Sequence, residues 1–471
     1  MRMKTWVILL LLVLVGFVIR IYRIQSLPMY GDELTMVYDT YSIAKTGTDS
    51  TGEKLPLTFK MGAGRPAGYI YFSIPFVKLL GPTALGIRAL SLLSGMGIII
   101  LMYFLGRKLF DERVGLLASL VMVISPWDIY LSRGGYEAHF ALFLALLGIT
   151  TFLYKRYVFW AIAWGLTIHT YPTFKLTLPI VGLLLFWFGG LKSLIRNRVF
   201  IVGLVILLFF AGLAIRETVK GGSEQRFLSS NIFADRNVKE SIIQRVNYER
   251  NISWLPKAIR PIFVNKQLEY GRMLLDNYVK NVSLDFLFVR GDGNPRHNPG
   301  EFGMFYLAEA VLILAGLMIL WQTKKKEFYL LTTWILITPL ATMFFPEAHA
   351  LRNGLMLPPL ILFTAFALIK IPKRFVFIAG VLIFLQLIYI LVRIYCIAPV
   401  KFASFWSVEA QKASLEAIKD EKAGKIIILS TSKIDNIEYA YPVYAKLDPK
   451  LVIALYGKFP KVYDNVVITD K

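Results

Sequence analysis

The sequence predicts a mainly α-helical protein that crosses a membrane many times. Of its 471 residues, 56% are hydrophobic, and the mean hydropathy is +0.57. Repeated apolar runs are long enough to cross about 30 Å of hydrocarbon, which takes roughly 20 helical residues. Lys and Arg gather in the short loops between alternate runs, as the positive-inside rule requires. These observations predict a polytopic bundle of transmembrane helices.

The apolar runs predict about eleven membrane helices. They lie near residues 6–21, 89–105, 114–130, 138–154, 159–168, 174–188, 200–215, 306–320, 329–345, 355–369 and 375–395. The fifth and sixth runs are short and punctuated by proline. The first run follows a basic start but no small-residue cleavage site follows it, so we expect an uncleaved membrane helix.

An N-terminus on the cytoplasmic side places every short basic loop inside. These loops are 106–113, 154–157, 192–198, 324–326 and 370–374. The long loops 23–88 and 216–303 then lie outside, and the second is basic because long loops translocate largely regardless of charge. We therefore expect a multi-pass protein of the cell membrane with its unusual polar residues on the extracytoplasmic face.

Two domains are predicted. Residues 1–398 form the transmembrane domain, and residues 399–471 form a small extracytoplasmic α/β tail. In the tail, the pattern predicts a helix at 404–422 and a strand at 425–430, followed by an apolar run at 451–456.

Charge and cysteine content exclude several classes of protein. The formal net charge is +22, but it is spread through short loops between apolar runs, which favours anionic lipid head groups over nucleic acid. The single cysteine, Cys396, excludes an internal disulfide and a cysteine metal cluster. The expected partners are therefore membrane lipids.

An acid pair follows the first apolar run on the predicted outer face. Asp32 and Glu33 come directly after Gly31, which permits a sharp turn. Ionised groups crowded together at a membrane boundary more often serve chemistry or binding than packing. The alternative is structural, because acids are favoured in the first turn of a helix by the helix dipole.

Two further external segments combine a cation with aromatic or acidic side chains. Arg65 lies among glycines just before Tyr69, where its planar fork of donors suits a phosphate. A snorkelling interfacial arginine and a membrane-belt tyrosine are the alternatives. Arg133 and Glu137 stand four residues apart and are expected either to pair on a helix face or to contact a ligand.

Two later external loops carry the remaining candidates. The turn-rich loop before residue 306 holds Arg290, Asp292, Arg296 and His297, and the loop after residue 345 holds His349 and Arg352. The chain has four histidines, and no pair has the close spacing of a helical zinc motif. The sequence therefore predicts no metal ligand set and no certain cofactor, although a divalent cation is compatible with it.

Taken in order, these segments resemble the GT-C glycosyltransferases of the protein O-mannosyltransferase and aminoarabinose transferase superfamily, which is glycosyltransferase family 39-like, and in particular its prokaryotic members. The resemblance spans most of the chain up to about residue 398. It is carried by the acid pair and by residues 65–71, 87–91, 106–110, 125–126, 132–133, 286–292, 294–297 and 349–352.

The resemblance implies an inverting transfer of a monosaccharide from a polyprenyl-phosphate donor to a protein, glycan or lipid acceptor outside the cytoplasm. Asp32 matches the family's catalytic base, with Glu33 supporting it. Arg65 and Arg352 would hold the departing phosphate, followed by Arg133 and Arg296. Relatives that modify lipid A have an acid before a lysine in the first loop as part of a metal site, whereas this chain has Gly64 before Arg65.

Two other classes of function compete with this interpretation. A transporter or lipid-linked sugar flippase would place charged or broken-helix sites near the membrane midplane, within repeated halves. Here the charges gather outside the apolar runs and no internal repeat is evident. A membrane scaffold with an external interaction domain would leave the acid and arginine cluster unexplained.

Overall fold

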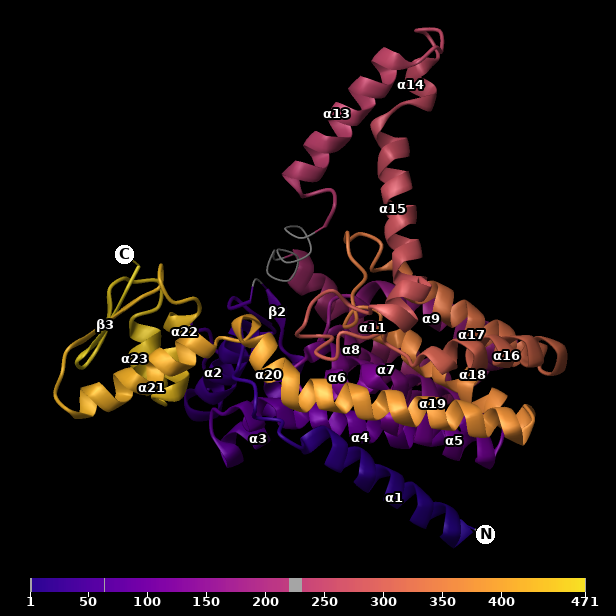
Figure 1. Cartoon of the computed structure of the whole chain (residues 1–471), viewed down its shortest axis with the longest axis horizontal. Helices are drawn as coiled ribbons and strands as arrows, with labels where there is room; N and C mark the ends of the chain where they lie inside the picture. The colour runs from indigo at the N-terminus through magenta and orange to yellow at the C-terminus, as the bar shows by residue number, and fades with distance from the viewer. Residues whose placement is uncertain (1, 63, 220–230, 471) are drawn as a thin grey trace.

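The computed structural model describes residues 2–62, 64–219 and 231–470, so residues 220–230 of the predicted large loop lie outside the described residues. The chain folds as an elongated helical bundle with a small α/β appendage at one end and a helical hairpin that projects sideways (Figure 1).

Helices of the first half of the chain form one part of the bundle. They are α1 (Arg2–Ile21), α2 (Gly31–Thr46), α3 (Gly68–Leu80), α4 (Ala84–Leu109), α5 (Glu112–Ile124), α6 (Pro126–Ser132), α7 (Glu137–Leu153), α8 (Tyr157–Ile168), α9 (Phe174–Gly189), α10 (Leu191–Ile195) and α11 (Arg198–Val219). A short antiparallel ladder between β1 (Thr58–Phe59) and β2 (Arg65–Pro66) pairs Phe59 with Arg65.

The rest of the chain supplies the hairpin and the second part of the bundle. The hairpin consists of α13 (Arg236–Ile252), α14 (Arg260–Phe263) and α15 (Lys266–Val282). The bundle continues with η1 (Asp285–Val289), α16 (Leu307–Thr323), α17 (Lys325–Ile337), η2 (Thr338–Leu340), η3 (Gly354–Met356), α18 (Leu357–Lys370), α19 (Lys373–Val392), η4 (Arg393–Ile397), α20 (Ala398–Lys401) and η5 (Ala403–Phe405).

Several helices have the length and composition of membrane spans. Four described helices qualify, namely Met3–Ile21, Ala84–Leu109, Arg198–Val219 and Lys373–Lys401, and the bent pair α5 and α6 would make a fifth. Six shorter helices are also apolar. The mainly helical membrane fold is thus confirmed, while the figure of about eleven spans stays a prediction.

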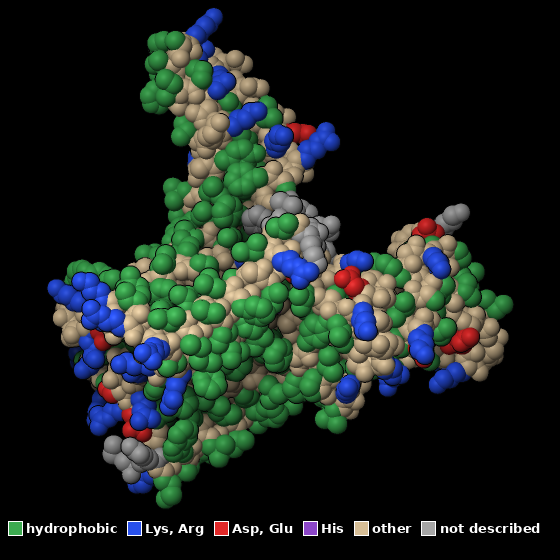
Figure 2. Space-filling view, turned by 180° about the vertical axis from the view of Figure 1, so that it is seen from behind, with side chains coloured by type: hydrophobic (Ala, Val, Ile, Leu, Met, Phe, Trp, Pro, Cys, Tyr) green, Lys and Arg blue, Asp and Glu red, His purple; other side chains and the backbone are tan. Residues whose placement is uncertain are grey.

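Burial distinguishes the centre of the bundle from its rim. In α4, 78% of the apolar window is buried, whereas the corresponding share is 22% in α1 and 17% in α11. A helix that is apolar all round is stable at the periphery only where lipid surrounds it. Lys and Arg gather at the end of the bundle remote from the appendage (Figure 2), as a cytoplasmic end would require.

The appendage is a small α/β unit, as the sequence predicts. It contains α21 (Val408–Lys422), β3 (Ile427–Ser430), α22 (Ile437–Tyr444), α23 (Pro449–Ala454), β4 (Lys461–Tyr463) and β5 (Val466–Thr469). The strand order is β3-β5-β4, with β3 parallel and β4 antiparallel to β5. The predicted apolar run at 451–456 falls mostly in α23. Helix α22 packs against α2, which brings the appendage beside the acid pair.

Candidate active site

The acid pair lies in the first turn of α2, where Tyr30 is the N-cap residue. Negative charge is stabilised there by the exposed N–H groups and the helix dipole. Consecutive residues of a helix point about 100° apart, since 3.6 residues make one turn. Asp32 and Glu33 therefore reach different partners.

Asp32 is held by a buried arginine. Arg65 Nη2 lies 2.7 Å from Asp32 Oδ1, and its Nη1 donates to Thr35 Oγ1 at 3.0 Å. Arg65 Nε forms an ion pair with Glu137 Oε1 at 2.7 Å. The Arg65 side chain is fully buried, whereas that of Asp32 is 38% exposed. The result is an oriented carboxylate that a substrate can reach.

Two glycines shape the loop before this arginine, and the first of them leaves room for its side chain. Gly62 has φ +79° and Gly64 has φ +85°, a backbone region that side chains rarely adopt. A Cβ at Gly62 would lie 2.8 Å from the Arg65 guanidinium. The small residues noted in the sequence thus allow the first loop to close around Arg65.

Glu33 is committed to a structural ion pair. Arg88 donates from Nε and Nη2 to the two carboxylate oxygens at 2.7 and 2.6 Å, and the Gly135 N–H donates at 2.7 Å. Arg88 also donates to the carbonyls of Ile24 and Pro28. The carboxylate of Glu33 is directed to Arg88 and Gly135, so it ties α2 to α4 and to the end of the first span.

Of the two alternatives for Arg133 and Glu137, the structure does not show the pairing on one helix face, because the two side chains reach other partners. Arg133 donates to the carbonyls of Arg20 and Tyr22 at 2.8 and 2.7 Å, at the C-terminal end of α1, and Glu137 pairs with Arg65. Carbonyls at a helix end lack partners within the helix, and a guanidinium satisfies several at once.

Arg133 and Arg296 nevertheless come together. Both line a small pocket of about 30 Å³, with Arg88, Tyr130 and Tyr136 in its wall. The Arg296 guanidinium lies 5.0 Å from the ring centre of Tyr30 and donates to the Phe405 carbonyl at 2.6 Å. Several cations at one pocket favour an anionic group.

A third group of polar side chains, Asp292, His297 and His349, comes together in the structure, although no pattern in the sequence groups them. His297 Nδ1 lies 3.1 Å from Asp292 Oδ2, and His349 Nδ1 lies 3.9 Å from the same oxygen. One ligand atom from each residue falls within 4.8 Å of the others. Burial alone would raise the pKa of Asp292, but the hydrogen bond from His297 and the two imidazoles lower it to about 2.

The sequence predicts no metal ligand set, yet these three residues can hold a metal ion. Two imidazoles and a carboxylate are a donor set that zinc accepts. The histidines lie 52 positions apart in the chain, so no local motif exists. The sequence indicated only that both histidines lie in loops on the same predicted side of the membrane.

The other candidate residues, Tyr69, Arg290 and Arg352, contact neighbouring groups of the protein. Tyr69 is buried, and its hydroxyl donates to the Ile87 carbonyl at 2.7 Å. The Arg290 side chain is 80% exposed and pairs with Asp285. The Arg352 guanidinium stacks 3.4 Å from the ring centre of Phe345.

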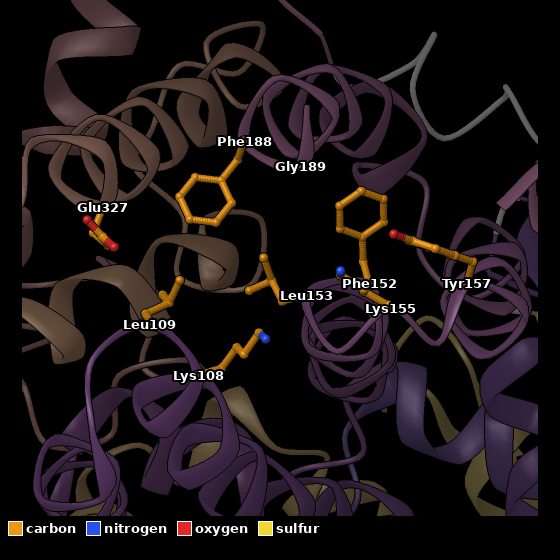
Figure 3. Close-up of a pocket in the computed structure, with 9 residues that line it drawn as sticks. All are labelled: Lys108, Leu109, Phe152, Leu153, Lys155, Tyr157, Phe188, Gly189 and Glu327. Atoms are coloured by element: carbon orange, nitrogen blue, oxygen red, sulfur yellow. The ribbon is translucent and has the colours of Figure 1, made fainter. Parts of the chain in front are cut away.

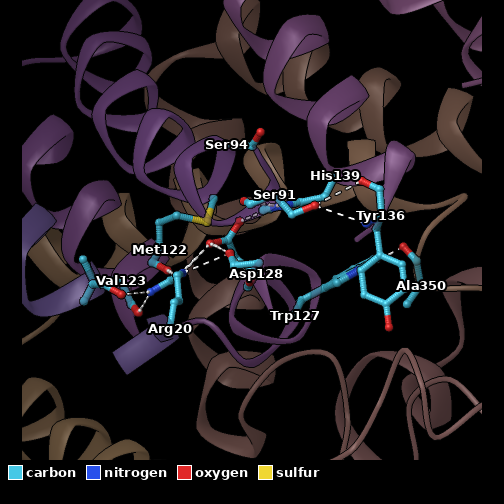
Figure 4. A network of polar contacts seen from close by, with 12 residues as sticks. Arg20, Ser91, Ser94, Met122, Val123, Trp127, Asp128, Tyr136, His139 and Ala350 are labelled. Atoms are coloured by element: carbon cyan, nitrogen blue, oxygen red, sulfur yellow. Dashed lines mark hydrogen bonds and ion pairs between the residues drawn. The ribbon is translucent and has the colours of Figure 1, made fainter. Parts of the chain in front are cut away.

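Sequence reasoning overlooked a buried network at the core of the bundle (Figure 4). Arg20 Nη2 lies 2.6 Å from Asp128 Oδ2, and His139 Nε2 lies 3.0 Å from Asp128 Oδ1. Arg20 also donates to the carbonyls of Met122 and Val123 at 3.0 and 2.9 Å. An arginine and an aspartate inside apolar runs were the available signal.

A pocket of about 190 Å³ lies elsewhere, at the basic end of the bundle (Figure 3). Lys108, Lys155 and Glu327 line it together with apolar side chains such as Phe152 and Phe188. Lys108 and Lys155 lie within loops predicted to be cytoplasmic, and Glu327 follows a third such loop. The acid pair lies at the appendage end of the bundle, so this pocket is not its binding cavity.

Comparisons with known proteins place the fold. No family model matches the chain, and no curated protein matches it. Among solved structures, the archaeal oligosaccharyltransferase AglB from Archaeoglobus fulgidus, in complex with an inhibitory peptide and a dolichol-phosphate, has a TM-score of 0.53 at 13% identity. The alignment covers 93% of this chain and 64% of AglB, so the chain spans less than two thirds of that protein.

Two further structures agree. ArnT from Cupriavidus metallidurans in the apo state has a TM-score of 0.53 at 11% identity, covering 95% of this chain and 85% of ArnT. The Archaeoglobus fulgidus oligosaccharyltransferase complex with Zn and sulfate has a TM-score of 0.52 at 12% identity, covering 92% and 61%. The chain therefore has the GT-C fold, as the sequence resemblance implies.

Proposed function

We propose that the chain is an integral membrane glycosyltransferase that moves a monosaccharide from a polyprenyl-phosphate donor to an acceptor on the extracytoplasmic face. The observation that carries the proposal is the partly exposed Asp32 carboxylate, held by the buried Arg65 at the start of α2. The GT-C fold supports it, and the dolichol-phosphate and peptide in the AglB complex support a lipid-linked donor and a separate acceptor.

In the proposed reaction, Asp32 accepts the proton of an acceptor hydroxyl. The acceptor oxygen attacks the anomeric carbon of the donor sugar from the face opposite the phosphate, so the configuration inverts. The bond between that carbon and the phosphate oxygen breaks, and the polyprenyl phosphate leaves as an anion. Such an anion needs no strong general acid, but it is stabilised by fixed positive charge.

The arginines divide these tasks in the proposal. Arg65 serves the base, because its donors already meet Asp32, Thr35 and Glu137. In the proposal, Arg133 and Arg296, which share one pocket, stabilise the leaving phosphate. Arg352, which stacks on Phe345, is the other candidate for this role. Glu33 acts through Arg88 as a positioning residue, because it fixes the first turn of α2.

The proposed topology follows the charge pattern. Helix α2, which carries the acid pair, lies at the appendage end of the bundle (Figure 1), and Lys and Arg side chains gather at the other end (Figure 2). An extracytoplasmic acid pair is thus compatible with a basic cytoplasmic end. The proposal therefore includes a multi-pass topology in the cell membrane, which this distribution of charge supports.

Exchange of Asp32 for Asn tests the base. Asn cannot accept the proton, so transfer from a labelled polyprenyl-phosphate sugar should fall by about a hundredfold or more. Binding of the labelled donor should persist. Asp285→Asn is the matched control, because Asp285 pairs with the exposed Arg290. Wild-type turnover in Asp32→Asn would remove the base assignment.

A divalent cation is proposed at Asp292, His297 and His349. Their donor atoms converge, and the zinc complex of the Archaeoglobus fulgidus oligosaccharyltransferase supports a metal in this fold. When bound, the ion would supply fixed positive charge to the outer face.

Metal content tests this site directly. Purified wild type, loaded with Zn²⁺ and desalted, should retain about one equivalent by elemental analysis, since three protein ligands suffice for a zinc site with an open position. His297→Ala and His349→Ala should lose it. His169→Ala, which alters a histidine bonded to the Phe210 carbonyl, should not. Equal metal content in all four proteins would argue against the site.

A further inference from the structure

The hairpin of α13, α14 and α15, here called the arm (residues 236–282), leaves the bundle sideways instead of packing on it (Figure 1). Its root is fixed. Asn277 Nδ2 donates to the Met343 carbonyl at 3.0 Å, and the Tyr278 hydroxyl donates to the Leu336 carbonyl at 2.9 Å. The arm is thus a built extension of the bundle.

The tip of the arm is held in shape by hydrogen bonds. Arg250 Nε donates to the Val264 carbonyl at 2.7 Å, and Arg260 donates to the carbonyls of Leu255 and Arg250 at 2.6 and 3.0 Å. Arg245 links the two long helices through an ion pair with Glu269 at 3.2 Å. These bonds fix the side chains that the tip presents.

That tip and one helix face are strongly apolar and uncovered. Trp254 is fully exposed, and Phe263 is 63% exposed. On α15, Leu268, Leu275 and Val279 are each more than half exposed. Their spacing of seven and four residues puts them on one face of the helix. Such a patch on a protein marks a contact with another apolar phase.

The direction in which the apolar face of α15 points indicates that the apolar phase is the lipid bilayer. Figure 2 shows hydrophobic side chains along the side of the arm that faces the basic end of the bundle, and Lys and Arg along the side toward the appendage. Leu336, whose carbonyl binds the root of the arm, is itself 49% exposed on α17. The apolar face of the arm therefore continues the apolar rim of the bundle.

We propose that the arm lies along the outer leaflet of the bilayer, with Trp254 and the apolar face of α15 inserted at the level of the head groups. The arm carries nine Lys or Arg against four Asp or Glu. A basic amphipathic helix with exposed aromatic and aliphatic residues binds such an interface, more strongly where lipids are anionic. The proposal rests on the proposed topology, and it adds a lipid contact to it.

The arm also touches the candidate site. The Asn281 side chain accepts from Asn353 Nδ2 and, at 3.4 Å, from the His349 N–H. The turn that carries His349 and Arg352 is thus bonded to the root of the arm. A lipid contact along the arm would fix the height of this turn above the hydrocarbon.

Spin labels in lipid nanodiscs test the proposal in the full chain. In a Cys396→Ala background, which removes the single cysteine, labels are placed by Trp254→Cys and Leu275→Cys. The control is Asp276→Cys, one residue from Leu275 and 61% exposed at its side chain. Nanodiscs of phosphatidylcholine, with and without phosphatidylglycerol, are compared with detergent micelles.

At positions 254 and 275, collisions with oxygen should exceed those with a water-soluble nickel complex several-fold relative to position 276, and phosphatidylglycerol should strengthen the contrast. Equal access of the nickel complex at all three positions would place the arm in water and overturn the proposal. Shielding of position 254 from both reagents would indicate a protein contact and overturn it equally. Neither readout depends on transfer activity, so a failure here is separate from a failure of Asp32→Asn.

Discussion

Asp39 shows how burial acts on a single residue near the site. It lies on α2 seven positions after Asp32, fully buried, and accepts hydrogen bonds from the N–H and hydroxyl of Ser50 on one oxygen. Its other oxygen meets no hydrogen-bond donor among the described residues. Burial raises the pKa of this carboxyl to about 7, with a smaller contribution from Asp49, against the opposing Ser50 hydrogen bonds.

This shift predicts a pH-dependent stability. The pKa of Asp39 in the folded protein lies above its ordinary value of 3.8. The contribution of Asp39 to the free energy of unfolding is therefore most favourable below pH 4, decreases between pH 4 and 7, and stays constant above pH 7. Asp39→Asn removes the cost of the buried charge, on the order of a few kcal/mol. The variant should melt at a higher temperature than wild type at pH 8 and at a similar temperature at pH 4.5.

Thermal unfolding of the detergent-solubilised protein, followed by intrinsic fluorescence, measures the effect. Asp420→Asn is the control, since Asp420 forms an exposed pair with Lys425. If Asp39→Asn keeps the wild-type pH profile, the loss of stability belongs to another group.

Single residues also mark the limit of sequence reasoning. The resemblance implies Asp32 as the base and Arg65 as a residue that holds the phosphate, whereas in the structure Arg65 pairs with Asp32 itself at 2.7 Å. Glu33 was grouped with Asp32 because it is adjacent, but helical geometry turns it toward Arg88. The partner of a charged residue depends on which helices pack together, and residue type alone does not give this.

At the scale of elements, the region around residue 125 shows why spans are harder to place than apolar runs. The sequence predicts one span at 114–130, whereas the structure breaks it into α5 and α6 with a 60° bend. Pro126 lacks an N–H, so the helix loses a hydrogen bond there. Arg20 compensates, because it donates to the Met122 and Val123 carbonyls just before the break.

The same bend also positions two polar residues of α6 and its C-terminal end, Asp128 and Arg133, against their partners. Asp128 in α6 receives Arg20 and His139, and Arg133 at the end of α6 holds the end of α1. Backbone that departs from a regular helix at this depth is stable only where other groups satisfy it. The apolar period of the sequence could predict the helices, but not this interruption, because the compensating arginine lies more than a hundred residues away.

The helices of the arm escaped prediction for a related reason. The loop 216–303 was recognised by its length and charge, and no helix was assigned within it. Apolar residues on one face of α13 and α15 read as scattered side chains among many charges. In the structure α13 and α15 contact each other, and their apolar residues are then seen to lie on common faces of the hairpin.

At the scale of the whole molecule, helix α2 of the bundle packs against helices α22 and α23 of the appendage. Tyr38 of α2 is buried, and its hydroxyl donates to the Leu447 carbonyl at 3.1 Å. A pocket of about 180 Å³ between the two parts is lined by Thr35, Tyr38, Tyr439 and Lys461 among others. The α/β tail could be predicted from its pattern, but its place on α2 depends on contacts between segments some 400 residues apart.

This arrangement predicts that the appendage stabilises the helix that carries the proposed base. Tyr38→Ala removes a large buried side chain and should cost about 3–5 kcal/mol, with a lower melting temperature and slower transfer, because the first turn of α2 would lose its support. Tyr38→Phe loses one hydrogen bond, about 1 kcal/mol, and should retain most transfer. Tyr248→Ala, an exposed position on α13, controls for loss of a tyrosine. Melting curves, transfer rates and the rate at which protease releases the appendage should change in parallel across the three variants. Were Tyr38→Ala to release the appendage while transfer stayed at the wild-type rate, α2 would hold Asp32 in place without help from the tail.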